Sequence, residues 1–436
     1  MARVAVIGGG AAGLAAAWTL AGRGQEVVLF ERSPVCGGVL SSDELEGAVI
    51  DTGVQLLGAN YTELFRIARE AGAGDLLVRS PGRDALWRDG RIHAITYGSI
   101  GSMAISGALP TKLKLKLATR YVPFLTREGA RLDVNDLTRG AGPAMDRESI
   151  GTWGVRELGQ DFVEYLVYPL LAAYYGNVPE TTTAGLYHAL ARVGMDVSVY
   201  AIRGGVGQLV SRIVRQLIQR GVAVRQGVEV TAIEQRDGRH VVHAEDLREE
   251  FDEMIVATPP GVAARLLAHH EPLRAWLSGV RTVPATIVAF LTNEPIGTDY
   301  FGLSIPRGNG VASDVVAFCN ESQKAGEVVP ADAGVLVVMP APAIAEEVAR
   351  LSPAEVVDRI MPALDRTLPH VRRTIRHARV YRHDRGYVQF YPGYVRHLAA
   401  YPKTPRPPGL RLAGDYLRAP TVEGAVRSGV EAGNGP

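Results

Sequence analysis

The chain has 436 residues, of which 47% are hydrophobic and 21% are charged, so it can bury a large core and two domains are expected. Its 47 basic and 46 acidic residues leave a net charge of +1, which gives no reason to expect nucleic acid as a partner. Cys36 and Cys319 are the only cysteines, which excludes a disulfide scaffold and a cysteine zinc site and is typical of a cytoplasmic protein.

The N-terminal segment predicts a strand, a glycine turn, a helix and a second strand. Apolar runs at 3–7 and 26–30 flank Gly8, Gly10 and Gly13, which have G-x-G-x-x-G spacing. The first glycine permits a tight turn, the second lets the backbone approach a pyrophosphate, and the third lets the helix pack against the strand. This pattern predicts a dinucleotide site, in which the start of the helix offers free N–H groups to the phosphates.

Glu31 ends the second strand, 18 residues after Gly13, where a carboxylate can accept hydrogen bonds from a ribose. The alternative is a glycine-rich turn in an ordinary α/β protein. Residues 4–22 carry no charge and could also be a signal peptide or a membrane helix, but four glycines interrupt the run. The glycine spacing and the terminal acid favour the nucleotide turn.

A second glycine pair, Gly37 and Gly38, follows the second strand and precedes Val39. This arrangement resembles the flavin amine oxidase superfamily, and the valine resembles its protoporphyrinogen oxidase branch rather than the amine oxidases that place arginine there. The resemblance implies FAD rather than NAD, with this loop passing along the pyrophosphate and ribityl chain.

Two later segments extend the resemblance. Residues 203–260 read as an amphipathic helix, two β-rich runs at 222–225 and 228–233, and an Ala-Thr-Pro-Pro exit, and the backbone of Val230 is implied to contact adenine. Residues 410–429 hold Gly-Asp and Glu-Gly-Ala motifs, which are implied to contact the ribityl chain and the flavin. Together the segments imply these cofactor-binding residues: Gly8, Gly10, Gly13, Glu31, Arg32, Gly37, Gly38, Val39, Val230, Gly414, Asp415, Glu423, Gly424 and Ala425.

The fold class predicted from these segments is α/β, with a Rossmann-type FAD-binding domain and a discontinuous α+β substrate domain. The FAD-binding domain is expected to comprise residues 1–75, 203–262 and 405–436. The substrate domain is expected to comprise residues 76–202 and 263–404.

Two stretches of the substrate half are candidates for the binding pocket. A leucine- and tyrosine-rich helix within 149–176 contains Leu170 and Tyr174, and the family resemblance implies that this helix lines the pocket. Residues 379–398 contain Tyr391 and Tyr394, the preferred substrate contacts, with Tyr387 and Arg396 as further candidates. Ordinary core packing is the alternative for each of these residues.

Residues 98–127 mix five basic residues with apolar ones, and no acid occurs between Asp89 and Glu128. This composition can lie on an anionic membrane surface. The alternative is a solvated helix that covers the substrate pocket. The expected location is therefore cytoplasmic, with peripheral membrane contact through this stretch as an open possibility.

The predicted reaction is dehydrogenation of a lipophilic or polycyclic small molecule by hydride transfer to flavin N5, with O₂ or another acceptor reoxidising FAD. The monoamine-oxidase group carries a lysine on the strand that here reads 285–291 and a cage tyrosine before the Glu-Gly-Ala motif. This chain has neither, because Thr421 and Val422 precede the motif. No side chain stands out as a catalytic base. An O₂-dependent oxidase of an amine or an amino-acid-derived metabolite, and a flavoprotein that only binds its ligand, remain alternatives.

Overall fold

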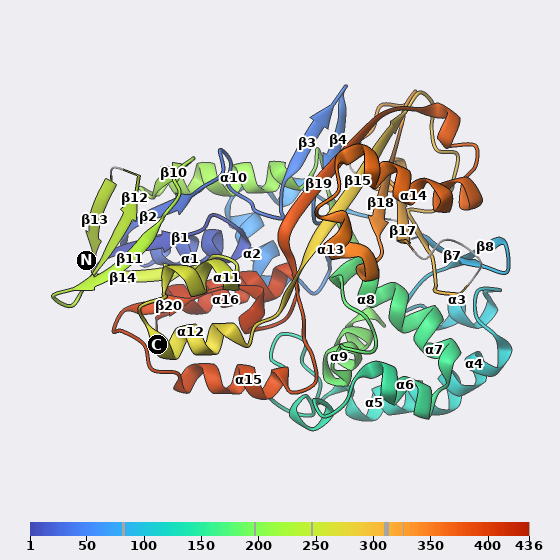
Figure 1. The fold of residues 1–436 in the computed structure, drawn as a ribbon, viewed down its shortest axis with the longest axis horizontal. Coiled ribbons are helices and arrows are strands. Elements are labelled where there is room, and N and C mark those ends of the chain that lie inside the picture. Colours follow the sequence, from blue (N-terminus) through green and yellow to red (C-terminus); the bar gives the residue numbers. More distant parts are fainter. Residues whose placement is uncertain (81–82, 196–197, 246, 309–313, 326, 436) are drawn as a thin grey trace.

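The computed structural model describes residues 1–435 except 81–82, 196–197, 246, 309–313 and 326. One half is built on a parallel sheet of five strands within this described part, in the order β10-β2-β1-β14-β20. Segments far apart in the sequence thus lie side by side (Figure 1). The strands are β1 (Arg3–Ile7), β2 (Glu26–Glu31), β10 (Ala223–Gln226), β14 (Glu253–Val256) and β20 (Leu410–Leu412).

Helices α1 (Ala11–Gly22), α10 (Val206–Gln219) and α16 (Val422–Asn434) pack against this sheet. Helix α1 consists of small apolar residues and is buried almost throughout, so its neighbour can approach closely. A Cβ atom at Gly429 would lie 2.0 Å from the carbonyl oxygen of Ala12, so only glycine permits this helix crossing. The sheet and its helices match the predicted Rossmann-type architecture.

Smaller elements surround this half. The run predicted at 228–233 is a strand only at its end, where β11 begins. A three-stranded meander and two small sheets complete the region, with these elements: β3 (Ser42–Leu45), β4 (Ala48–Asp51), β5 (Leu57–Gly58), α2 (Thr62–Glu70), β6 (Leu77–Arg79), β9 (Val199–Ile202), β11 (Ala232–Arg236), β12 (Arg239–Ala244), β13 (Leu247–Phe251), α11 (Pro260–Leu266) and α12 (Glu271–Ser278).

The other half is built on a mixed sheet with the strand order β19-β15-β18-β17-β16-β7-β8 in the described residues. All pairs are antiparallel except β16 with β7. Helix α14 (Pro353–Thr367) covers one face and α13 (Ala345–Val348) lies beside this half, whereas α15 (Tyr394–Ala400) lies against α12 of the other half. The strands are β7 (Asp84–Arg88), β8 (Arg91–Ile95), β15 (Thr282–Thr292), β16 (Gly302–Ser304), β17 (Val315–Asn320), β18 (Gly334–Pro340) and β19 (Ile375–Val388).

A buried charged cluster joins the two halves. The ammonium group of Lys324 pairs with the carboxylate of Asp51 and lies 3.1 Å from Glu321 Oε2. The same aspartate accepts hydrogen bonds from Ser42 Oγ at 2.6 Å and from the N–H of Val206 at 2.8 Å. The two carboxylates hold the pKa of Lys324 above its usual range. The side chain of Asp51, at the end of β4, is therefore bonded to the start of α10 and to the turn that follows β17.

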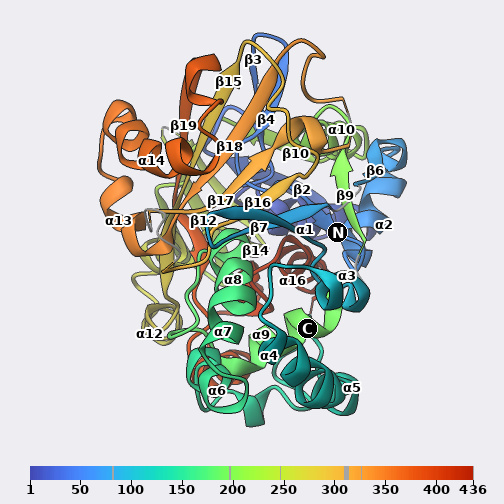
Figure 2. The ribbon, with the colours of Figure 1, turned by 90° about the vertical axis from the view of Figure 1, so that its right-hand side faces the viewer.

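A helical layer lies below the mixed sheet in Figure 2. None of the described helices is both long enough and apolar enough to cross a bilayer. The layer contains α3 (Ile100–Ile105), α4 (Thr111–Lys116), α5 (Val122–Gly129), α6 (Ile150–Glu157), α7 (Gln160–Phe162), α8 (Tyr168–Tyr175) and α9 (Ala184–Gly194).

His188 on α9 is fully buried in the helical layer. It is surrounded by the rings of Tyr121, Phe124, Trp153 and Tyr187, and its Nδ1 lies 3.2 Å from the hydroxyl of Tyr121. Its Nε2 has no hydrogen-bond partner among the described residues. Burial lowers the pKa of His188 to about 3, so the imidazole is neutral in the folded chain.

This burial predicts an acid sensitivity. Above pH 6.5 His188 is neutral in both the folded and the unfolded chain. Below pH 6.5 the unfolded chain binds a proton at His188 that the folded chain does not bind. The free energy of unfolding of the wild type should therefore fall more steeply than that of His188→Phe between pH 6 and 4, by about 1.4 kcal/mol per pH unit. Urea unfolding followed by circular dichroism measures this slope. His269→Gln, which changes an exposed histidine, should keep the wild-type slope. Parallel curves for His188→Phe and the wild type would contradict the assignment.

Candidate active site

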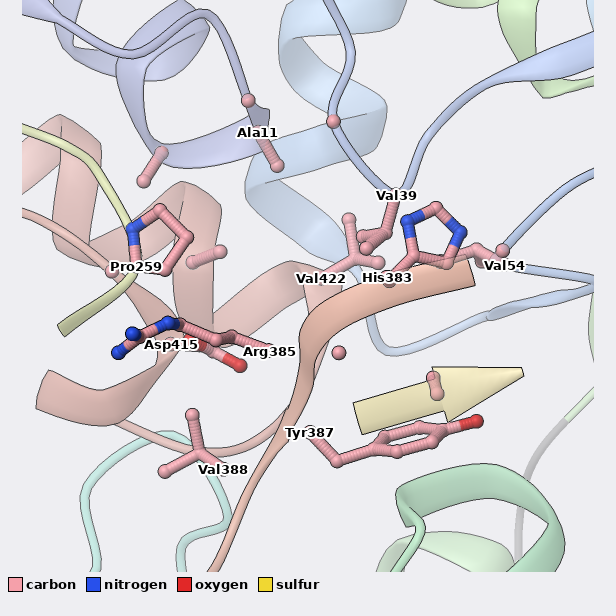
Figure 3. Close-up of a pocket in the computed structure, with 18 of the residues that line it drawn as sticks. Ala11, Val39, Val54, Pro259, His383, Arg385, Tyr387, Val388, Asp415 and Val422 are labelled. Carbon is pink, nitrogen blue, oxygen red and sulfur yellow. The ribbon is translucent and has the colours of Figure 1, made fainter. Parts of the chain in front are cut away.

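A cavity of about 420 Å³ runs from the edge of the parallel sheet onto the mixed sheet (Figure 3). Its lining comes from both halves of the molecule, and it contains most of the residues that the sequence assigned to the cofactor. Of the predicted set, the lining residues are Gly8, Gly10, Glu31, Arg32, Gly37, Gly38, Val39, Val230, Gly414, Asp415 and Ala425.

The glycine turn forms one end of the cavity. Gly8 has φ = 104° and donates its N–H to the carbonyl of Phe30, which makes the turn tight. Gly10 caps helix α1 without a side-chain hydrogen bond, and a Cβ atom built on it would meet no protein atom within 4 Å. At Gly13 the same atom would lie 1.8 Å from the carbonyl oxygen of Gly8. The helix start therefore faces the cavity, while Gly13 serves packing from outside it.

Glu31 lies beside this turn and is buried. Its carboxylate accepts hydrogen bonds from the N–H groups of Gly9 at 2.7 Å and Ser33 at 2.8 Å. Two backbone donors hold the side chain in place, and Glu31 still lines the cavity, as does Val230. This geometry leaves acceptor capacity for a sugar hydroxyl.

The second glycine pair also needs glycine for conformational reasons. Gly37 has φ = 131° and Gly38 has φ = 58°. The N–H of Gly37 donates to the carbonyl of Gly9 at 2.9 Å, which ties this loop to the first turn. The two glycine segments thus form one continuous backbone wall of the cavity.

Asp415 lines the cavity from the C-terminal motif. Its Oδ1 accepts a hydrogen bond from the N–H of Tyr416 at 2.9 Å, and burial raises the pKa of Asp415 to about 7. Figure 3 shows Arg385 on the same side of the cavity. The guanidinium of Arg385 occupies the space left by Gly261, since a Cβ atom there would lie 1.3 Å from its nitrogen.

Two residues of the Glu-Gly-Ala motif are placed differently from the expectation. Glu423 is fully buried and accepts hydrogen bonds from the N–H groups of Glu63 and Leu64 at 3.0 and 3.1 Å, so it caps helix α2. The N–H of Gly424 donates to Thr421 Oγ1 at 2.9 Å. Neither Glu423 nor Gly424 lines the cavity.

Ala425 does line it, although its N–H donates to the carbonyl of Thr421 at 3.0 Å. The N–H groups of Gly424 and Ala425, which were expected to face the flavin, are therefore both bonded to Thr421 in this structure.

The substrate half contributes a largely apolar wall. Ala285 and Ile287 on β15 and Met339 on β18 line the cavity from the mixed sheet. Tyr174 on α8 and Tyr387 on β19 add aromatic rings, and Tyr174 is 45% exposed because it faces the cavity. No lysine occurs on β15, as the sequence already indicated.

Four of the predicted substrate contacts lie outside the lining. Tyr394 is fully buried and donates its hydroxyl to the carbonyl of Tyr416 at 2.8 Å. Tyr391 donates to the carbonyl of Gly279 at 2.8 Å. Leu170 packs against the large core, and Arg396 is likewise absent from the cavity wall. Tyr387 lines the cavity from the end of β19, whereas Tyr391 lies beyond the last residue of this strand, Val388.

The cavity residues that sequence reasoning missed include four with titratable side chains, namely Asp84, Tyr175, His383 and Arg385. The last two could have been found, because they lie four and two residues before Tyr387 and so share its face of the strand. No local signal marks Asp84, which only strand pairing brings to the cavity.

The residues present fit FAD, the expected cofactor. The uncapped start of α1 and the open space above Gly10 can receive a pyrophosphate. Glu31 would hold the adenosine ribose, and the carboxylate of Asp415 would accept hydrogen bonds from the ribityl hydroxyls. These three features lie along one cavity, as a dinucleotide requires.

A family model described as flavin containing amine oxidoreductase matches residues 11–434. The mitochondrial protoporphyrinogen oxidase of Nicotiana tabacum is 27% identical over 181 residues, which are 41% of this chain and 34% of that protein. The phytoene dehydrogenase of Streptomyces griseus is 28% identical over 295 residues, or 62% of this chain and 57% of that protein. The chain thus matches less than two thirds of the length of either relative.

The same fold occurs in the cyclohexylamine oxidase of Brevibacterium oxydans IH-35A. The two structures agree with a TM-score of 0.76 at 16% identity, over 99% of this chain and 98% of that one.

The contrast between Gly10 and Gly13 predicts two different phenotypes. Gly10→Val should fold normally, because a Cβ atom at this position meets no protein atom within 4 Å, but it should lose at least about tenfold in FAD affinity by occupying the phosphate position. Gly13→Ala should instead destabilise the fold, by about 1–3 kcal/mol, because its methyl group collides with the turn. Flavin absorbance after dilution and thermal unfolding of both proteins measure these effects. Full flavin content in Gly10→Val would contradict the placement of the phosphates.

Proposed function

The chain belongs to the flavin containing amine oxidoreductase family, and from this premise we propose that it dehydrogenates a hydrophobic or polycyclic small molecule. It is an FAD-dependent oxidoreductase, and FAD supplies the chemistry by accepting a hydride from the substrate. The observation that carries the proposal is the apolar and aromatic wall that the mixed sheet and helix α8 give to the cavity.

The side chains of this wall bind and orient the substrate. Ile287, Met339 and Tyr387 present apolar surface along the cavity, so an apolar molecule gains by leaving water. The same side chains exclude water from the reacting carbon. Dehydrogenation removes a hydride, which FAD would accept, and a proton, which would be released to solvent, and the sequence marks no side chain as a base for that proton.

The matches to a protoporphyrinogen oxidase and a phytoene dehydrogenase support a large apolar substrate, since the names of both relatives imply one. A second candidate, O₂-dependent oxidation of an amine, is favoured by one observation. Asp84 places a carboxylate in the cavity, and carboxylates bind protonated amines. The absence of a lysine on β15 argues against the lysine-assisted route for small primary amines.

We further propose that residues 98–127 contact an anionic membrane surface. Ile105 is 87% exposed and Leu115 is 64% exposed, and the exposed Lys112 lies between them in the sequence. Apolar side chains that insert beside basic ones bind anionic headgroups. Lys116 is not part of the proposed membrane contact, because its ammonium group donates to the carbonyl of Leu158 at 2.7 Å.

The proposed chemistry predicts a substrate preference. An apolar polyene or a porphyrinogen should reduce the bound flavin at least about tenfold faster than benzylamine, because hydride transfer needs the donor carbon about 3–3.5 Å from N5 and a wide apolar cavity does not hold a small amine there. Anaerobic stopped-flow absorbance measures the rates. Faster reduction by benzylamine than by any apolar compound would reverse the order of the two candidate functions.

The membrane proposal predicts salt-dependent sedimentation with vesicles of phosphatidylglycerol and phosphatidylcholine. The triple variant Ile105→Ser/Lys112→Glu/Leu115→Ser should remain in the supernatant at low salt and keep its flavin spectrum. Ile218→Ser, which removes an exposed apolar side chain on α10, should sediment like the wild type. Equal sedimentation of the triple variant and the wild type would contradict membrane contact and favour the alternative, a solvated helix that covers the substrate pocket.

A further inference from the structure

Asp84 is the first residue of β7 and lines the cavity from the mixed sheet. Strand β7 pairs with β16 in parallel, so that Gly302 lies opposite Asp84. A Cβ atom at Gly302 would lie 2.7 Å from Asp84 Oδ1. The missing side chain at Gly302 therefore leaves the space that the carboxylate occupies.

The cavity crosses the mixed sheet from strand to strand before it reaches Asp84. Successive strands contribute lining residues on one face: Tyr387 on β19, Ala285 and Ile287 on β15, Met339 on β18, Ala317 and Cys319 on β17, Gly302 and Ser304 on β16, and Asp84 on β7. Four strand spacings separate β15 from β7, a path of about 19 Å along the sheet. Asp84 thus lies at the end of the cavity remote from the glycine turns.

The carboxylate at this end has no cationic partner. The N–H of Gly302 donates a hydrogen bond to it, and the described part of the chain places no lysine, arginine or histidine beside it. Burial raises the pKa of Asp84 to about 7. Its titratable neighbours are Tyr97, Tyr174 and Cys319, and burial raises the pKa of each, so all three are neutral near pH 7.

We propose that Asp84 binds a protonated amine at the end of the substrate remote from the carbon that is oxidised. The assignment rests on the proposed function, because it requires that the substrate occupies this cavity. It names the substrate class as an elongated, largely apolar amine. The nitrogen held by Asp84 is not the site of oxidation, because the width of four strands lies between Asp84 and the end of the cavity that holds the flavin.

The surroundings of Asp84 support a cation rather than a neutral group. Tyr174 presents an aromatic ring to the same cavity, and aromatic faces attract ammonium groups. Between Asp84 and the flavin end, Met339 and Ile287 provide the apolar middle section. A buried carboxylate without a counter-charge is costly, and a bound ammonium removes that cost.

The test uses the FAD-loaded protein and three ten-carbon probes: decylammonium, decanol and decanoate. Calorimetric titration at pH 8 should show that the wild type binds decylammonium about ten- to a hundredfold more tightly than decanol, with decanoate weakest. Asp84→Asn should remove this preference and keep the affinity for decanol. Asp89→Asn, the same charge change on the exposed turn of the same hairpin, should bind all three probes like the wild type.

A wild type that binds decanol as tightly as decylammonium overturns the proposal, as does an Asp84→Asn protein that keeps the preference. If Asp84→Asn does not fold, the wild type alone decides, because its preference for decylammonium should grow between pH 6 and 8 as the carboxylate ionises while the alkylammonium stays protonated. A preference that is constant with pH then overturns it. Binding requires no turnover, so failure of the proposed dehydrogenation would appear separately, as a flavin that apolar substrates do not reduce.

Discussion

The cavity depends on the buried pairing of Asp51 with Lys324. Both side chains are almost fully excluded from solvent, and Glu321 beside them adds a second carboxylate. A buried ion pair adds little net stability over an apolar contact, but removal of one partner leaves an uncompensated charge at a cost of about 3–5 kcal/mol. The ion pair therefore matters for the position of the chain rather than for net stability. Gln55 donates to the carbonyl of Asp51 at 2.8 Å and lines the cavity, so the charged cluster fixes the wall between the two halves.

Much of the cofactor end could be predicted from the sequence, because its signals are local. Gly8, Gly10 and Glu31 fall within one strand-helix-strand unit, and their spacing along the chain determines their spacing in space. Glu423 shows the limit of a motif. The motif around it was expected to contact the flavin, whereas its carboxylate caps α2, some 360 residues earlier in the chain.

The substrate end could be predicted only in part, because pairing between distant strands builds it. Asp84 reaches the cavity since β7 pairs with β16, which lies over 200 residues later, and no local pattern carries that information. Tyr391 was preferred to Tyr387 as a substrate contact, yet Tyr391 lies beyond the end of β19 and Tyr387 lines the cavity. Under the two proposals above, a wall of apolar side chains and a remote carboxylate suit one molecule that is both hydrophobic and cationic.

The parallel sheet has a consequence for synthesis of the protein. Strand β20 pairs with β14, and Met254 lies opposite Leu410, so the last strand of the nucleotide-binding sheet leaves the ribosome after nearly all of the chain. At about 5–20 residues per second, the first glycine turn waits at least about 20 s for its last neighbours. During this interval the nascent chain exposes the edge of β14 and the small-residue face of α1, which α16 later covers. The cofactor site is therefore completed only after β20 and α16 have been synthesised.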